Sequence, residues 1–69
     1  MEGTIAELLR QRGVGYVLGA DGRTYLFYRG ALQDSWFHEL REGAAVTFEP
    51  LKDATGLRAK LIRLVRAST

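Results

Sequence analysis

Two short extended runs joined by a turn signal constrain the fold of this chain most strongly. Residues 12–17 and 25–28 are rich in aliphatic and aromatic residues, and Asp21-Gly22 lies between them. The Asp-Gly dipeptide is typical of tight β-hairpin turns. Gly13 and Gly15 each disfavour a helix by about 1 kcal/mol relative to alanine. The sequence therefore predicts a hairpin of two β-strands in this region.

The predicted hairpin has one face of mixed aromatic and aliphatic character. Alternate residues of a strand point to the same side, so one face carries Val14, Tyr16, Leu26 and Tyr28. Arg12 and Arg29 lie at the two rims of this face. Aromatic rings edged by guanidinium groups suit single-stranded nucleic acid, because bases stack on rings and phosphates attract cations.

Length and composition predict one domain with a thin core. The chain has 69 residues, 46% of them hydrophobic, and no cysteine, so neither disulfides nor thiolate metal sites are available. Ten basic and eight acidic residues leave a net charge of +2, and eight of the basic residues are arginine. This balance permits nucleic-acid binding without demanding it.

Several functional classes are disfavoured by what the sequence lacks. No apolar run approaches the roughly 20 residues that span a bilayer, and the first residues do not look like a signal peptide. We therefore expect a cytoplasmic protein that does not enter membranes. His38 is the single histidine and is interpreted as an unpaired surface residue. With no nucleophile–base pair visible, we expect neither enzymatic activity nor a cofactor or metal.

Both ends of the chain are ambiguous between helix and strand when judged by periodicity alone. Apolar residues at 5, 8 and 9 and at 57, 61, 64 and 65 have helical spacing. A module of two helices and a hairpin therefore stays open at this point. Residues 45–49 alternate in the manner of a strand, and four residues are assigned to the core: Tyr25, Phe27, Val46 and Phe48.

Five segments in a fixed order resemble one known family. Residues 12–17, Arg-Gly-Val-Gly-Tyr-Val, are similar to the Lys-Gly-Phe-Gly-Phe-Ile motif of bacterial cold-shock domains, and 25–32 are similar to the second motif of that family. The other matching segments are 3–5, 37–49 and 56–62. The resemblance covers about residues 3–62. It implies an all-β, five-stranded antiparallel OB-fold barrel in which both ambiguous ends are strands.

The resemblance also implies a binding face, and several of its positions are altered here. Family members stack bases on exposed aromatic residues. At the corresponding positions this chain has Glu7, Leu8, Val14 and Leu26, while Tyr16, Tyr28 and Phe37 keep an aromatic ring. Each lost platform removes about 1–3 kcal/mol of stacking. We therefore expect a degenerate face of modest affinity.

The candidate nucleic-acid-binding residues form two chemical groups. The rings predicted to stack on bases are Tyr16, Tyr28, Phe37 and Trp36. The cations predicted to contact phosphates are Arg12, Arg29, Arg58 and Lys60, with Arg10 as a further candidate.

The sequence supports two leading hypotheses on function. The first is a single-stranded RNA- or DNA-binding protein of low sequence specificity, similar to cold-shock RNA chaperones. The second is a cold-shock-like barrel that has lost nucleic-acid binding and instead contacts a protein partner, or a second copy, through the aliphatic replacements Leu8, Val14 and Leu26.

Overall fold

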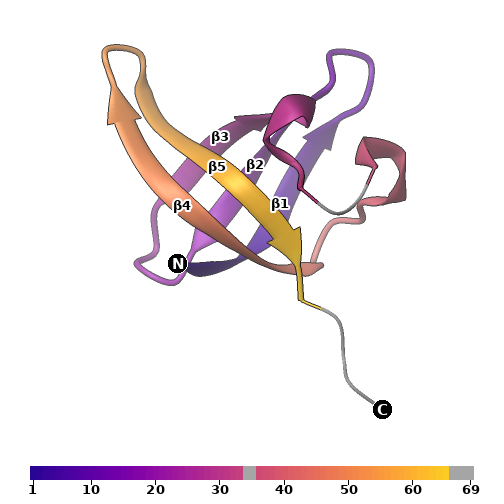
Figure 1. Ribbon diagram of the computed structural model, residues 1–69, viewed down its shortest axis with the longest axis horizontal. Helices are drawn as coiled ribbons and strands as arrows, with labels where there is room; N and C mark the ends of the chain where they lie inside the picture. The colour runs from indigo at the N-terminus through magenta and orange to yellow at the C-terminus, as the bar shows by residue number, and fades with distance from the viewer. Residues whose placement is uncertain (34–35, 66–69) are drawn as a thin grey trace.

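The chain folds into five β-strands and two single-turn 3₁₀ helices (Figure 1). The computed structural model describes residues 1–33 and 36–65. No helix in that part of the chain is long and apolar enough to cross a membrane. The elements, in chain order, are β1 (Glu2–Leu9), β2 (Val14–Gly19), β3 (Thr24–Tyr28), η1 (Arg29–Ala31), η2 (Phe37–Glu39), β4 (Ala45–Asp53) and β5 (Gly56–Leu64).

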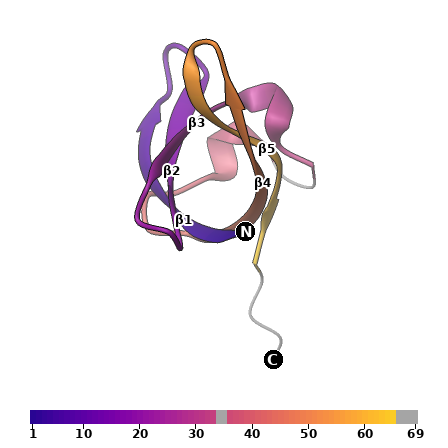
Figure 2. The same cartoon turned by 90° about the vertical axis from the view of Figure 1, so that its left-hand side faces the viewer.

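The strands form a closed barrel in the order β1-β2-β3-β5-β4, and β4 pairs again with β1 (Figure 2). The all-β, five-stranded prediction is confirmed, but the prediction of a purely antiparallel barrel is wrong. The contact between β3 and β5 is parallel. A ring with an odd number of strands cannot alternate direction at every contact, so closure of five strands requires at least one parallel pair.

Both ambiguous ends are strands, β1 and β5, and each contains a β-bulge. In β1, Ile5 pairs with Val17 and Glu7 with Tyr16, so one extra residue is inserted between them. Because of this insertion, Ile5 and Leu8 both pack toward the core although they are three residues apart. The hypothesis of two terminal helices is therefore wrong.

The second bulge lies in β5 opposite Phe48. Thr47 pairs with Arg63 and Glu49 with Lys60, so two residues of β5 face one of β4. Leu61 absorbs the extra length with φ of 52°, in the left-handed region that L-residues rarely adopt, and its side chain is exposed. Ile62 can then return to the core.

The interior is apolar throughout the described residues. All four residues assigned to the core from the sequence are buried there, among nine in total: Ile5, Val17, Tyr25, Phe27, Leu40, Val46, Phe48, Ala59 and Ile62. Gly15 pairs with Phe27, and a Cβ atom at Gly15 would lie 2.7 Å from Phe27 Cζ and 2.8 Å from the Glu7 carbonyl oxygen. The Phe27 ring therefore needs a glycine beside it.

We predict that Gly15→Ala destabilises the barrel by about 1–3 kcal/mol, because the added methyl group over-packs the core against both a ring and a backbone oxygen. Urea unfolding followed by circular dichroism measures the change. Gly30→Ala is the matched control, since nothing lies within 4 Å of a Cβ atom at that exposed position. Equal stability of the two variants would contradict this account of Gly15.

The turn between β2 and β3 is fixed by Asp21. One carboxylate oxygen accepts the Arg23 N–H at 3.0 Å, and the other accepts the Tyr25 hydroxyl. Gly22 has φ of 81°, which suits glycine. The Tyr25 hydroxyl, followed by the Arg23 N–H, lowers the pKa of Asp21 below its ordinary value, and the carboxylate raises the pKa of Tyr25.

Because of this turn, the free energy of unfolding varies with pH in the acidic range. Because the pKa of Asp21 is lower in the folded chain, its contribution is present above the ordinary pKa of 3.8 and is lost as the pH falls through the folded value. We predict that Asp21→Asn lowers the urea midpoint at pH 7 and that the gap to wild type closes below about pH 4. Tyr25→Phe should show a similar dependence in this acidic range, and a constant gap would contradict the assignment.

Candidate nucleic-acid interface

Two tyrosines lie on the outer side of β2 and β3. Val14 pairs with Tyr28, and Tyr16 pairs with Leu26, so the two tyrosines are diagonal neighbours on one face. Tyr28 is 48% exposed, whereas Tyr16, Val14 and Leu26 are half-buried. These four residues together with Arg58 are called the tyrosine face below. The alternation predicted from the sequence is confirmed.

Arg58 joins this face from a strand distant in sequence. The parallel contact between β3 and β5 sets Arg58 beside Leu26. Its guanidinium carbon lies 4.9 Å from the centre of the Tyr28 ring, which is a cation–π arrangement. Tyr28 and Arg58 are therefore brought together by the barrel.

The turn after β4 holds the Arg58 guanidinium in place. Arg58 Nη2 donates to Thr55 Oγ1 at 3.0 Å, and Arg58 Nε lies 3.7 Å from Asp53 Oδ2. The other Asp53 oxygen accepts the Thr55 hydroxyl at 2.6 Å and the Thr55 N–H at 2.8 Å. The Thr55 hydroxyl, then its N–H, and also the Arg58 charge lower the pKa of Asp53. Arg58 is thus oriented before any ligand arrives.

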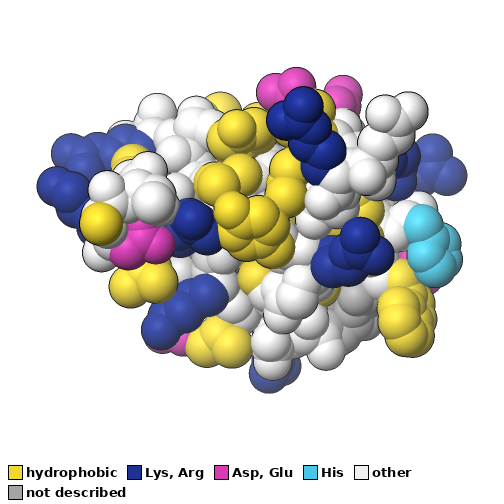
Figure 3. Space-filling view, turned by 90° about the horizontal axis from the view of Figure 1, so that it is seen from above, with side chains coloured by type: hydrophobic (Ala, Val, Ile, Leu, Met, Phe, Trp, Pro, Cys, Tyr) yellow, Lys and Arg dark blue, Asp and Glu magenta, His cyan; other side chains and the backbone are white. Residues whose placement is uncertain are grey.

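Charges of both signs border the tyrosine face. Lys60 follows Arg58 by two residues on β5 and is exposed. Glu7 pairs with Tyr16 and is also exposed, so a negative charge borders the second ring. Seen from above, hydrophobic side chains gather at the centre of the molecule with Lys and Arg side chains on either side (Figure 3). This surface offers rings and cations to a flat, anionic ligand.

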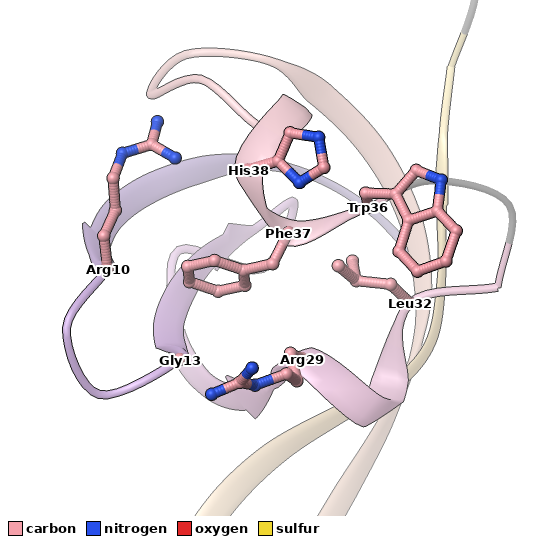
Figure 4. Close-up of a pocket in the computed structure, with 7 residues that line it drawn as sticks. All are labelled: Arg10, Gly13, Arg29, Leu32, Trp36, Phe37 and His38. Carbon is pink, nitrogen blue, oxygen red and sulfur yellow. The ribbon is translucent and has the colours of Figure 1, made fainter.

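Four other predicted residues, Arg10 among them, lie in a separate hollow beside this face. Arg29 follows Tyr28 directly and begins η1, while Trp36 and Phe37 lie at the start of η2. The hollow has a volume of about 530 Å³ (Figure 4). It is called the arginine pocket below and is lined by Arg10, Gly13, Arg29, Leu32, Trp36, Phe37 and His38.

The two aromatic residues of the pocket differ in their packing. The Phe37 ring is half-buried, and its centre lies 6.1 Å from that of Phe27 in the core. Trp36 is 71% exposed, and its ring stacks on His38 with 6.5 Å between centres and 17° between planes. The interpretation of His38 as an unpaired residue is therefore wrong, although it does lie on the surface. Within the described residues, no acidic or histidine cluster could hold a metal ion.

Arg12 stands apart from both groups. It is exposed in the turn between β1 and β2, where its N–H donates to the Leu9 carbonyl oxygen at 3.0 Å. The structure thus divides the predicted residues between the tyrosine face with adjacent Lys60, the arginine pocket, and this turn. Leu32 and His38 are pocket residues that no sequence motif indicates.

Comparisons with known proteins identify the fold. No model of a known protein family matches the chain, and no curated protein sequence matches it. A solved structure, Drosophila Unr CSD456, matches with a TM-score of 0.70 and 22% identity. The match covers 94% of this chain and 26% of the Unr chain. The chain has the fold of a cold-shock domain. The three-dimensional structure therefore supports the cold-shock fold that the order of motifs implied.

We predict that Arg58 and Tyr28 are energetically coupled. A double-mutant cycle of Arg58→Leu and Tyr28→Leu in urea unfolding should give a coupling of about 0.5–1 kcal/mol, as expected for an exposed cation–π pair. The matched cycle of Lys60→Leu with Tyr28→Leu should give none, because no contact joins that pair. Equal coupling in the two cycles would show that the stacking seen here contributes nothing in solution.

Proposed function

We propose that this protein binds single-stranded RNA or DNA with low sequence specificity. The observation that carries the proposal is the pair of outward tyrosines, Tyr16 and Tyr28, beside the guanidinium of Arg58. Aromatic rings on a sheet surface with cations alongside are the parts that sequence-tolerant binders of single strands use. The cold-shock fold is consistent with this use.

In this proposal, bases stack on rings and phosphates follow cations. Tyr16 and Tyr28 supply the main platforms, and Phe37 and Trp36 extend them beyond the end of β3. Phosphates lie near the basic residues around them: Arg12, Arg29, Arg58 and Lys60. Since every base has a face that stacks, little discrimination among sequences follows.

Affinity is expected to be modest. Val14 and Leu26 occupy positions on the tyrosine face where a ring would add about 1–3 kcal/mol per stacked base. Glu7 adds repulsion beside Tyr16. Arg58 offsets part of this loss, because a guanidinium plane held over a ring can itself stack on a base. By analogy with the fold we propose an RNA-chaperone role, and the cysteine-free composition suits the cytoplasm.

Titration of oligo-dT and oligo-U tests the proposal, with the exposed Trp36 as the fluorescent reporter. Tyr28→Leu and Tyr16→Leu should each weaken binding by about 5- to 100-fold, since each removes a stacking ring but keeps an apolar side chain. Arg58→Gln should lower the slope of log K against log salt concentration by about 0.7, the value for one lost phosphate contact. Circular dichroism checks that each variant keeps the fold.

Two matched controls make this test specific. Val65→Ala changes an exposed apolar residue just after β5, and Arg23→Gln removes a charge at the end of β3 opposite to Tyr28. Neither should alter affinity or salt slope by more than about twofold. Absence of binding even at low salt would reject the proposal. If the chain then self-associates or binds a protein through Val14 and Leu26, the alternative of a protein-interaction module is correct.

A further inference from the structure

The arginine pocket carries chemistry that the tyrosine face lacks. Its lining comes from three segments of the chain: the turn at residues 10–13, residues 29–32, and residues 36–38. These segments bound the hollow on three sides (Figure 4). Its volume of about 530 Å³ falls in the range of small-molecule binding sites. A single bound group, rather than a continuous strand, suits such a shape.

Two guanidinium groups make the pocket cationic. Arg10 and Arg29 both line it, and none of the lining residues is acidic. Across residues 1–33 and 36–65, the one carboxylate that forms an ion pair with an arginine is Asp53, which pairs with Arg58. Neither pocket arginine is therefore neutralised by a described carboxylate. The pocket has a charge complementary to an anion.

A backbone carbonyl holds the Arg10 guanidinium, and Gly13 leaves room for that of Arg29. Arg10 Nη2 donates to the Leu40 carbonyl oxygen at 2.7 Å, and this bond leaves other N–H groups of the fork available. The Arg29 side chain lies against Gly13, where a Cβ atom would come within 2.7 Å of Nε. Gly13 has φ of 68°, and its carbonyl oxygen accepts the Arg29 N–H at 3.0 Å. In the view of Figure 4 the Phe37 ring lies between the two guanidinium groups.

Aromatic surface adjoins these cations. Phe37 presents a ring braced against Phe27, and the stacked pair of Trp36 and His38 lines the pocket as well. The backbone N–H of Trp36 donates to a Glu39 carboxylate oxygen at 2.9 Å, which helps to fix the turn that carries the pair. A ligand with both a flat ring and a compact anion would use every part of this pocket. A nucleotide has both.

We propose that the arginine pocket binds the end of a nucleic-acid strand that carries a terminal phosphate monoester. This inference rests on the proposed function, and it adds a preference for one kind of strand end. A monoester carries about −1.5 to −2 charges at pH 7 and three acceptor oxygens, whereas an internal diester carries one charge. A pocket lined by two guanidinium groups attracts the more highly charged monoester more strongly than the diester.

The position of the pocket favours a strand end over an internal nucleotide. Tyr28 and Arg29 are consecutive, and Gly13 precedes Val14, so the pocket begins where the tyrosine face stops. A strand lying on that face therefore reaches the pocket with its terminal nucleotide. The same chemistry serves a 5′-phosphate or a 3′-phosphate, and the experiment separates them.

The test compares three hexamers of oligo-U: one with hydroxyl ends, one with a 5′-phosphate and one with a 3′-phosphate, all at the same ionic strength. We expect one phosphorylated hexamer to bind about tenfold tighter than the hydroxyl form, since charge-assisted hydrogen bonds to the monoester are gained. Arg10→Gln should bring this preference close to one. Arg10→Lys, which keeps the charge but not the fork, should retain part of it.

Arg23→Gln is the matched control and should leave the preference at its wild-type value, because Arg23 lies at the opposite end of β3 from the pocket. Thermal melts check that the Arg10 variants keep the fold, since Arg10 also bonds Leu40. If all three hexamers bind equally, the terminal-phosphate inference fails while the proposed function stands. If Arg23→Gln reduces the preference as much as Arg10→Gln, the effect is general electrostatics and the pocket is not the site. If no hexamer binds, both proposals fail.

Discussion

The candidate interface depends on the parallel contact between β3 and β5. Closure of five strands forces one parallel pair, and here that pair sets Leu26 beside Arg58. Without it, Arg58 would belong only to the β4–β5 hairpin, and its guanidinium would not reach the Tyr28 ring. The mixed character of the tyrosine face, with rings and a cation side by side, is therefore a consequence of barrel closure.

Among the described residues, Arg58 is the arginine whose guanidinium is held by a carboxylate. Asp53 and Thr55 hold its guanidinium by an ion pair and a hydrogen bond, so little side-chain entropy is left to lose on binding. The same arrangement has a cost, because the Asp53 carboxylate competes with a phosphate for the guanidinium. Such a site permits stacking by the guanidinium plane and weakens, without preventing, its contact with a phosphate. This competition agrees with the modest affinity for single strands that we propose.

Glycine placement links the core to the arginine pocket. Gly15 leaves room for the Phe27 ring inside the barrel, and Phe27 in turn supports the Phe37 ring at the arginine pocket. Gly13, two residues earlier, leaves room for the Arg29 guanidinium outside it. The two glycines of the first motif thus serve packing at two places, one in the turn before β2 and one within β2.

Local patterns determined the hairpin, four of the nine core residues and the outward tyrosines, because strand alternation and an Asp-Gly turn are encoded within a few neighbouring residues. Motif order further implied the cold-shock fold. Tertiary structure alone decided that Ile5 and Leu8 share the interior through a bulge, although their spacing imitates a helix. It also decided that Arg58 reaches Tyr28 and that Arg10, Arg29 and His38 share one pocket, because these contacts join segments distant in sequence.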